Sequence, residues 1–323
     1  MKRIFIASMS LAFVLSLAFT NSAFAAGKTL RIAMILWRGE TDAERGFKDG
    51  LKELGYSVQF RIWNTAQNRP EVGRLLRNDI KPQLNRFDYI YTFGTTVSKM
   101  TRAVVKDQVP QIFTIVVAPV GAGLVQSMES SGGNISGASN VIPLPLQIRT
   151  ALKITKFGRL GLLFNPREKN SMIVRERLYE ISKDFGFEVV DLRSPPAGNM
   201  LEGNLQKLID KSVAVDAIYL PNDSFLLSRA KLIGRQLRAA RVKSIAAVKS
   251  YIDNGALMGV VADYYKVGKA AARIVDRHQK GERLKYIPIY RDREPKLVIN
   301  RATLKALNMK VSEGLLKNAL FAD

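Results

Sequence analysis

Apolar runs alternate with segments of helical periodicity over residues 29–117. The run TLRIAMIL at 29–36 is rich in apolar residues, as a buried strand is, whereas YSVQFRIW at 56–63 alternates in polarity like a half-buried strand. Strand and helix patterns follow one another throughout this segment, which predicts a parallel sheet with helices on both faces. Further strands are predicted at 87–93 and 111–117, and helices at 40–54, 70–84 and 95–106.

The same alternation starts again at residue 159. Two of its predicted helices each carry one apolar stripe, which is typical of a helix that packs on a sheet. Two similar halves predict two doubly wound α/β lobes with parallel sheets. The stripes are Val174, Leu178, Ile181 and Phe185 in the helix at 170–185, and Leu226, Ala230, Ile233 and Leu237 in the helix at 223–240. The remaining elements of this half are a helix at 200–211 and strands at 159–164, 187–192, 215–220, 243–248 and 256–261.

The C-terminal tail is longer than two simply joined lobes require. It reads as a helix at 264–280, strands at 286–290 and 296–300, and a helix at 301–309. Such a tail could return the chain to the first lobe and then cross back, so a hinge of three crossings is predicted near 138–144, 260–264 and 288–297. The N-terminal lobe is then expected to comprise residues 26–138 and 263–290, and the C-terminal lobe residues 139–262 and 291–323.

The chain begins with the pattern of a secretory signal. A basic start, MKR, precedes the apolar run IFIASMSLAFVLSLAF, and Ala23 and Ala25 supply small residues for cleavage after Ala25. Residues 1–25 are therefore predicted to be a signal peptide, and a membrane anchor is disfavoured because the apolar run is short. No cysteine follows the cleavage motif to carry a lipid, which favours the periplasm of a two-membrane bacterium.

Composition excludes several classes of site. The absence of cysteine rules out disulfides and thiolate chemistry. The formal net charge of +22 comes from lysine and arginine spread through every predicted helix, so a solvated surface is favoured over nucleic-acid binding. The single histidine, His278, falls in the last turn of a predicted helix, where a structural role is expected. No cofactor, metal or catalytic motif is expected, and the chain is not predicted to be an enzyme.

The turn Gly121-Ala-Gly123 follows a predicted strand, as a dinucleotide-binding loop does. The fingerprint requires a third small residue where this chain has Gln126, and no acid for a ribose lies about 20 residues further on. The glycines are therefore interpreted as a tight turn after Pro119.

Loops that follow the predicted strands carry the candidate ligand-binding residues, because ligands of doubly wound folds bind beyond the carboxyl ends of strands. Thr95 and Thr96 begin a helix whose free N–H groups suit a carboxylate, although they could also cap it. Arg38 could bind a carboxylate bidentately or stay solvated, and Trp37 could cover a flat ligand or serve only the packing of its lobe. The other candidates are Ala118, Asn140, Asn165, Asn222, Asp223, Lys249 and Asp263.

Several segments resemble the solute-binding proteins of ABC transporters whose characterised relatives bind aromatic amino acids such as tryptophan. They cover nearly the whole mature chain in order. This resemblance implies a type I periplasmic-binding fold with a hinged cleft, and it implies that the Gly-x-Gly turn belongs to a cleft loop. The segments are DAERGFKDGLKELGY, IFTIVVAPVGAGLVQSMESSGGNISGAS, RLGLLFNPREKNS, VDAIYLPNDS, NGALMGVVADYYKVGKAAARIV and PKLVINRATLKALNM.

Two departures from these relatives bear on the ligand. Relatives typically read T-D-P-V where this chain has Val117-Ala118-Pro119-Val120, and Lys249 stands where relatives often carry acidic residues. A buried ammonium group needs an acceptor. These changes favour an anionic or neutral ligand such as a carboxylate, an aromatic acid or a small polar organic compound. Asp223 or Asp263 could still receive an ammonium group, and Asp263 could instead cap the following helix.

The resemblance implies an exported, monomeric solute-binding protein that passes a small molecule to an ABC permease in the inner membrane. A binder of aromatic amino acids, as in the relatives, is one alternative. Another alternative is a periplasmic sensor that presents its ligand to a membrane receptor or kinase. An enzyme on the same fold would need a catalytic constellation that the sequence lacks.

Overall fold

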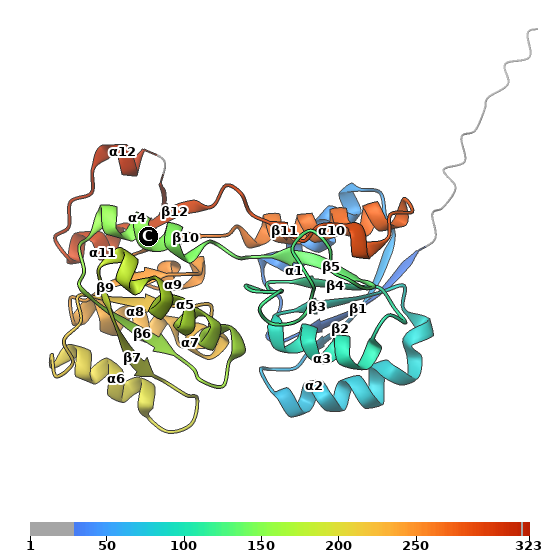
Figure 1. The fold of residues 1–323 in the computed structure, drawn as a ribbon, viewed down its shortest axis with the longest axis horizontal. Helices are drawn as coiled ribbons and strands as arrows, with labels where there is room; N and C mark the ends of the chain where they lie inside the picture. Colours follow the sequence, from blue (N-terminus) through green and yellow to red (C-terminus); the bar gives the residue numbers. More distant parts are fainter. Residues whose placement is uncertain (1–28, 318) are drawn as a thin grey trace, which may run out of the picture.

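The structure is a computed structural model, and it describes residues 29–317 and 319–323. The signal peptide predicted at residues 1–25 lies outside the described residues. Two lobes lie side by side and are joined by extended segments (Figure 1). Within the described residues, no helix is long and apolar enough to cross a membrane.

The N-terminal lobe contains a parallel sheet with the strand order β11-β5-β4-β3-β1-β2. Helices α1 and α10 cover one face of this sheet, and α2 and α3 cover the other face together with two irregular turns, η1 and η2. The strands are β1 (Leu30–Leu36), β2 (Val58–Asn64), β3 (Tyr89–Phe93), β4 (Gln111–Thr114), β5 (Ile135–Ser139) and β11 (Tyr290–Arg291). The helices are α1 (Asp42–Glu53), α2 (Arg69–Leu75), η1 (Leu76–Ile80), η2 (Lys81–Arg86), α3 (Thr95–Val105), α10 (Tyr264–Gln279) and η3 (Leu284–Tyr286).

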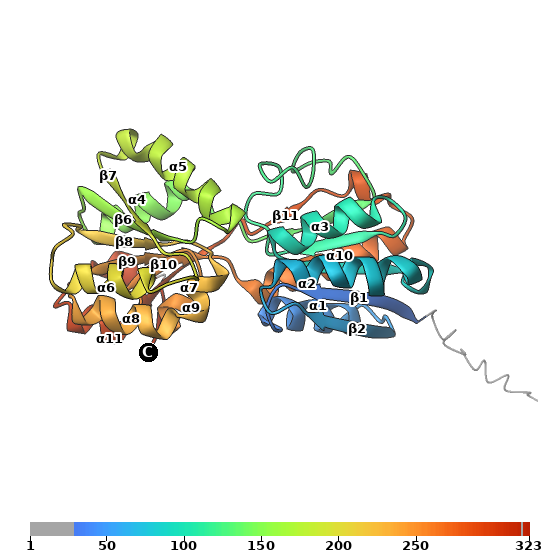
Figure 2. The same cartoon turned by 90° about the horizontal axis from the view of Figure 1, so that it is seen from below.

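The C-terminal lobe contains a second sheet with the order β13-β12-β10-β9-β8-β6-β7. Strands β6 to β10 are parallel, and the edge pair β12 and β13, which are parallel to each other, runs antiparallel to them. Helices pack on both faces, as Figure 2 shows from below. The strands are β6 (Arg159–Phe164), β7 (Glu188–Arg193), β8 (Ala217–Leu220), β9 (Lys243–Ala246), β10 (Met258–Val261), β12 (Lys296–Asn300) and β13 (Leu320–Ala322). The helices are α4 (Leu144–Ile154), α5 (Lys169–Phe185), α6 (Met200–Ile209), α7 (Ser224–Ser228), α8 (Ala230–Ala239), α9 (Lys249–Asp253), α11 (Arg301–Ala306) and α12 (Glu313–Leu316).

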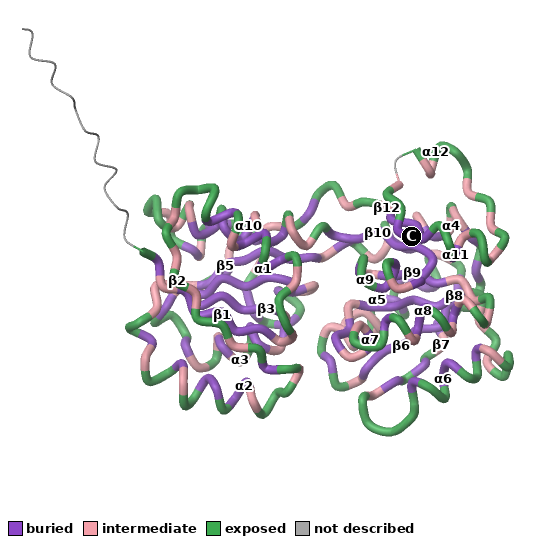
Figure 3. The backbone as a smooth tube through the Cα atoms, turned by 180° about the vertical axis from the view of Figure 1, so that it is seen from behind, coloured by how far each residue is buried: buried purple, intermediate pink, exposed green. Residues whose placement is uncertain are grey.

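Within the described residues, the chain passes between the sheets three times. The crossings are 140–143 between β5 and α4, 262–263 between β10 and α10, and 292–295 between β11 and β12. Both sheets are buried at the centre of their lobes, whereas the connecting segments alternate between buried and half-buried or exposed residues (Figure 3). The two lobes therefore have separate cores and are linked by thin segments, which is the arrangement that permits a hinge motion.

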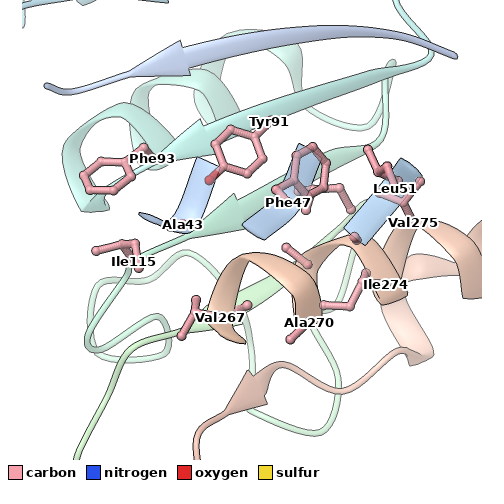
Figure 4. Packing of buried hydrophobic residues seen from close by; sticks show 14 of the residues in the cluster. Ala43, Phe47, Leu51, Tyr91, Phe93, Ile115, Val267, Ala270, Ile274 and Val275 are labelled. Carbon is pink, nitrogen blue, oxygen red and sulfur yellow. The ribbon is translucent and has the colours of Figure 1, made fainter. Parts of the chain in front are cut away.

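The most intimate contact of the N-terminal lobe is between α1 and α10, which are far apart in the sequence. Phe47 of α1 lies against Tyr91 of β3 with ring centroids 4.7 Å apart. Val267 and Ala270 of α10 face the same cluster from the opposite side (Figure 4). Helix α10 therefore completes the core of the N-terminal lobe after the chain has passed through the C-terminal lobe from α4 to β10.

Several elements differ from the sequence-based predictions. The strand predicted at 111–117 ends at Thr114, because Ile115 adopts a φ of 55°. The helix predicted at 223–240 is broken at Arg229 into α7 and α8. The strand predicted at 286–290 is reduced to β11, Tyr290–Arg291, which overlaps the prediction at Tyr290 alone. β5 and α4 were not predicted at all, because the Gly- and Ser-rich segment 132–139 and the Pro-interrupted segment 143–154 lack a clear apolar period.

Candidate functional site

A cavity of about 590 Å³ lies between the two lobes. We call it the main cavity. It is lined from both lobes, and its wall mixes apolar residues with cations and carboxylates, so it can enclose a small organic molecule with a polar group. The N-terminal lobe contributes Arg38, Thr41, Asp42, Gln67 and Tyr264, and the C-terminal lobe contributes Ser224, Leu227, Ser228, Val248, Lys249, Ser250, Asp253, Val261, Lys296, Val298 and Leu320.

A second, narrower space of about 20 Å³ adjoins the first, because Arg38 and Ser224 line both. We call it the inner pocket. It is also lined from both lobes: Trp37, Arg38, Phe93, Gly94, Thr95, Thr96 and Ile115 come from the N-terminal lobe, and Glu168, Asn170, Asn222 and Ser224 from the C-terminal lobe. Most of these residues follow the carboxyl end of a strand, where the parallel topology brings loops together.

Arg38 is positioned by the loop between β1 and α1. That loop ends in a capping box, in which the Thr41 hydroxyl accepts the Ala43 N–H and the Glu44 carboxylate accepts the Thr41 N–H. The guanidinium of Arg38 lies 5.1 Å from the centroid of the Phe93 ring. It interacts with the Tyr264 hydroxyl but is ion-paired with no carboxylate among the described residues, so its charge stays unneutralised at the cleft.

The N-terminus of α3 points its free amides toward the inner pocket. The residue before the helix, Gly94, has a φ of 84° and offers no side chain as a cap. Thr95 is 7% exposed and Thr96 is half-buried, and both line the pocket. An uncapped helix start carries free N–H donors and a partial positive charge, both of which suit an anion.

The structure places Trp37 in the wall of the inner pocket. Its ring packs against the apolar clusters on both faces of the N-terminal sheet, and its carbonyl accepts the Gln67 N–H. This position fits both expectations for Trp37, a wall for a ligand and a contact within the lobe.

Glu168 was not singled out from the sequence. It follows β6 in the segment NPREKNS, is 7% exposed and lines the inner pocket. Its Oε2 accepts the Ser224 N–H at 2.7 Å. Burial and the neighbouring Asp223 carboxylate raise the pKa of Glu168 to about 8, so this side chain is largely protonated at neutral pH.

Asp223 is fully buried and serves the structure of the loops. Its Oδ1 accepts the Leu226 N–H and caps α7, and its Oδ2 accepts the Asn165 N–H and the Ser171 hydroxyl. Asn165 forms a local turn by accepting the Arg167 N–H, and it lines neither pocket. The two residues therefore hold the neighbouring loops together behind the pocket surface.

The remaining predicted site residues are distributed over the cleft and the crossings. Asn222 lines the inner pocket, and its carbonyl accepts a hydrogen bond from Asn170. Asp263 lines the main cavity and caps α10 by accepting the Lys266 N–H. Asn140 lies in the first crossing, where its amide donates to the Tyr264 hydroxyl at 3.3 Å and its Oδ1 has no partner among the described residues.

Ala118 and Lys249, the two residues that favoured an anionic or neutral ligand, do not present a free cation or an open wall to the inner pocket. Ala118 lines neither pocket. Lys249 lines the main cavity, but its Nζ lies 2.5 Å from an Asp253 carboxylate oxygen, so its charge is locally balanced. His278 lies away from both pockets and forms a hydrogen bond with the Tyr89 hydroxyl. No cluster of potential metal ligands is found among the described residues.

The titration of Glu168 predicts a pH dependence of the unliganded protein. An acid whose pKa rises from 4.5 to about 8 on folding favours the folded state at low pH, and this contribution is lost as the pH rises from 4.5 to about 8. We expect Glu168→Gln to stabilise the unliganded protein at pH 8 by about 4 kcal/mol and to have little effect at pH 4.5.

Urea unfolding at several pH values measures this effect. Glu44, whose pKa is also raised by burial, remains in the variant, so the pH dependence should become weaker without vanishing. An equal effect of Glu168→Gln at pH 4.5 and pH 8 would contradict the assignment.

Comparison with known proteins assigns the chain to a family. Residues 32–321 match the family described as ABC transporter substrate binding protein. The chain belongs to this family. The resemblance inferred from the sequence is thereby confirmed, and this substrate-binding protein is of the class that binds small ligands.

A curated relative and two solved structures are similar to this chain, the structures in fold. A tyrosine-binding protein of Clostridioides difficile (strain R20291) is 27% identical over 289 residues, which cover 88% of this chain and 81% of that protein. A conserved domain protein from Vibrio cholerae superposes with a TM-score of 0.82 at 23% identity, over 92% of this chain and all of that chain. An ABC domain from Streptococcus pneumonia in complex with L-Trp has a TM-score of 0.82 at 22% identity, over 91% of this chain and all of that chain. These likenesses confirm the predicted fold of two α/β lobes.

Proposed function

We propose that this substrate-binding protein works in the periplasm as a monomer, captures a small organic ligand bearing a carboxylate, and delivers it to an ABC permease in the inner membrane. The proposal extends the family assignment in compartment, partner and ligand chemistry. The signal predicted at residues 1–25 supports the compartment. The family assignment supports the permease as partner.

One observation carries the ligand class. The inner pocket contains the Arg38 guanidinium, which is ion-paired with no carboxylate among the described residues, and the uncapped start of α3 at Thr95 and Thr96. A guanidinium and free helix amides together favour a carboxylate, which they can bind with charge-assisted hydrogen bonds. The rest of the ligand would extend into the main cavity, whose apolar wall includes Leu227, Val261 and Val298.

Capture would require no chemical step. Ligand contacts come from both lobes, so a bound molecule stabilises a closed arrangement over an open one in proportion to its differential affinity. The three crossings would absorb the rotation, because they are short and lie outside both sheets.

The test uses the mature chain, residues 26–323, purified and analysed by native mass spectrometry and small-angle X-ray scattering. We expect a carboxylate-bearing molecule to co-purify or to bind from a panel of small organic acids and amino acids. Binding should shrink the radius of gyration, and a ligand at one hundred times its Kd should add about 2.7 kcal/mol of stability. A chain that neither closes nor gains stability with any carboxylate would contradict the proposal.

A further inference from the structure

A further cavity lies outside the cleft, on the N-terminal lobe. It has a volume of about 640 Å³, and we call it the outer groove. One wall is a face of α10, and the other is formed mainly by β11 and residues 292–294 of the third crossing (Figure 1). Among the described residues, none lines both the outer groove and the cleft. The groove is therefore a separate site, and its size suits a small organic molecule.

The α10 wall of the outer groove combines apolar and cationic side chains. Lys266, Ala270, Arg273 and Arg277 follow one another at spacings of four, three and four residues, which place them on one face of the helix. Ala270 and its neighbour Ile274 are buried, whereas the three cations are exposed. The groove therefore has an apolar floor and a positively charged rim.

The opposite wall adds two arginines. Arg291 and Arg293 flank Asp292, line the groove and are exposed. Asp292 itself is buried, and its two carboxylate oxygens accept the N–H groups of Asp263 and Glu294. Asp292 therefore holds the turn that presents the two arginines, and it is ion-paired with neither of them.

Most cations of the outer groove are available to a ligand. Arg277 is ion-paired with Glu282. Two exposed carboxylates, Glu129 and Glu294, also line the groove but form no ion pair with its cations. An anion could therefore contact several cations at once without breaking an ion pair. The cations that are ion-paired with no carboxylate, in the part of the chain that the structure describes, are Lys266, Arg273, Arg291 and Arg293.

The number of arginines favours a phosphate group over a carboxylate. A carboxylate has one charge and two oxygens, which a single guanidinium can satisfy. A phosphate monoester carries close to two negative charges at neutral pH and has three free oxygens, so it can accept hydrogen bonds from several arginines. The Tyr290 hydroxyl adds a donor: burial and the Asp292 carboxylate raise its pKa, so it keeps its proton at neutral pH.

We propose that the outer groove binds a phosphate monoester, with the phosphate held by Arg273, Arg291 and Arg293 and the organic part on the apolar floor of α10. The monoester is either a soluble organic phosphate or the headgroup of a phospholipid, since both present the same group. This inference does not depend on the proposed function, because the groove lies outside the cleft and does not involve Arg38.

The experiment has a soluble arm and a lipid arm, both with the mature chain at low ionic strength. In the soluble arm, calorimetry compares glycerol 3-phosphate with glycerol and adenosine 5′-monophosphate with adenosine. In the lipid arm, the protein is sedimented with vesicles of phosphatidylcholine alone or of phosphatidylcholine and phosphatidic acid in equal amounts. We expect a phosphate monoester to bind at least about tenfold more tightly than its phosphate-free partner in one arm or both. The arm that binds more tightly identifies the source of the phosphate.

Three variants separate the groove from a general attraction of anions to a basic protein. Arg273→Gln should weaken phosphate binding about tenfold, because one charge-assisted contact is lost. Glu294→Gln removes a carboxylate that repels the phosphate and should strengthen binding about threefold. Arg235→Gln removes an exposed charge of α8 in the other lobe and should leave the affinity unchanged. All three side chains are exposed, so the variants should fold like the parent protein, which urea unfolding checks.

Three outcomes overturn the inference. The first is that no phosphate monoester binds in either arm. The second is that Arg235→Gln weakens binding as much as Arg273→Gln does, because the attraction is then a property of the whole surface. The third is that Arg38→Ala abolishes phosphate binding while Arg273→Gln does not, because the phosphate then occupies the cleft.

Discussion

Replacing Arg38 by alanine should weaken ligand binding about a hundredfold or more. The guanidinium is the cation of the inner pocket that has no carboxylate partner among the described residues. Its removal leaves a ligand carboxylate with the α3 amides alone, and a desolvated carboxylate deprived of its cation loses most of its electrostatic stabilisation. Calorimetric measurement of Kd for the ligand found with the parent protein checks this expectation.

Further variants distinguish geometry from charge. Arg38→Lys keeps a positive charge but cannot bind bidentately or stack on Phe93 in the same way, so about a tenfold loss is expected. Arg235→Ala removes an exposed arginine of α8 and should leave Kd unchanged. The unliganded Arg38→Ala protein should lose no more than about 1 kcal/mol of stability, because no ion pair is lost and only the contacts with Phe93 and Tyr264 go. Unchanged affinity in Arg38→Ala would show that the carboxylate binds elsewhere.

Replacing Gly268 by alanine should destabilise the N-terminal lobe by about 3 kcal/mol or more. Helices α1 and α10 approach so closely that a Cβ at Gly268 would overlap the Ala43 carbonyl oxygen and crowd the Phe47 amide nitrogen. A Cβ at Gly46 would overlap the Tyr265 carbonyl oxygen in the same way. The atoms in the way belong to the backbone, so relief requires the helices to separate and to loosen the cluster around Phe47 (Figure 4).

The sign of this effect is diagnostic, because helix propensity alone predicts the opposite. A glycine-to-alanine change inside a helix normally stabilises it by up to about 1 kcal/mol. Gly203 of α6 offers that control, since a Cβ there meets nothing within 4 Å. Urea unfolding combined with hydrogen exchange should show weakened protection in α1 and α10 for Gly268→Ala and a small gain for Gly203→Ala. A gain in both variants would contradict the close helix contact.

The architecture was predictable from sequence where a clear apolar period exists. Strands such as β1 and β6 and helices such as α5 carry unambiguous runs or stripes, and the long tail indicated the return of the chain to the first lobe. β5 escaped prediction because ISGAS is buried by its neighbours in the sheet and not by its own apolar character. Tertiary burial of small residues leaves little trace in a local pattern.

The site was predictable in its location and less so in its chemistry. Topology placed Arg38, Thr95, Thr96 and Asn222 in the cleft, because loops after parallel strands meet at one edge. The sequence could not distinguish Asp223 from Glu168. Both follow strands. Whether the carboxylate of such an acid is satisfied by helix amides or faces a pocket depends on contacts between loops nearly 60 residues apart in the sequence. The sequence likewise suggested Lys249 as a cation available to a ligand. In the structure it forms an ion pair with Asp253, one helical turn away.

The return of α10 to the N-terminal lobe also affects the order in which the chain can fold during synthesis. Tyr56 of the N-terminal lobe is hydrogen-bonded to Asp276, 220 residues further on, and Asp49 to Tyr265, 216 residues further on. During synthesis, the apolar face of α1 must therefore wait for α10 to emerge before it can be covered. Contacts of such long range form slowly, because a large loop has to close first. The export that we propose for this chain would benefit from that delay, since it keeps the polypeptide unfolded, and thus able to thread through a translocation pore, until most of its length has been made.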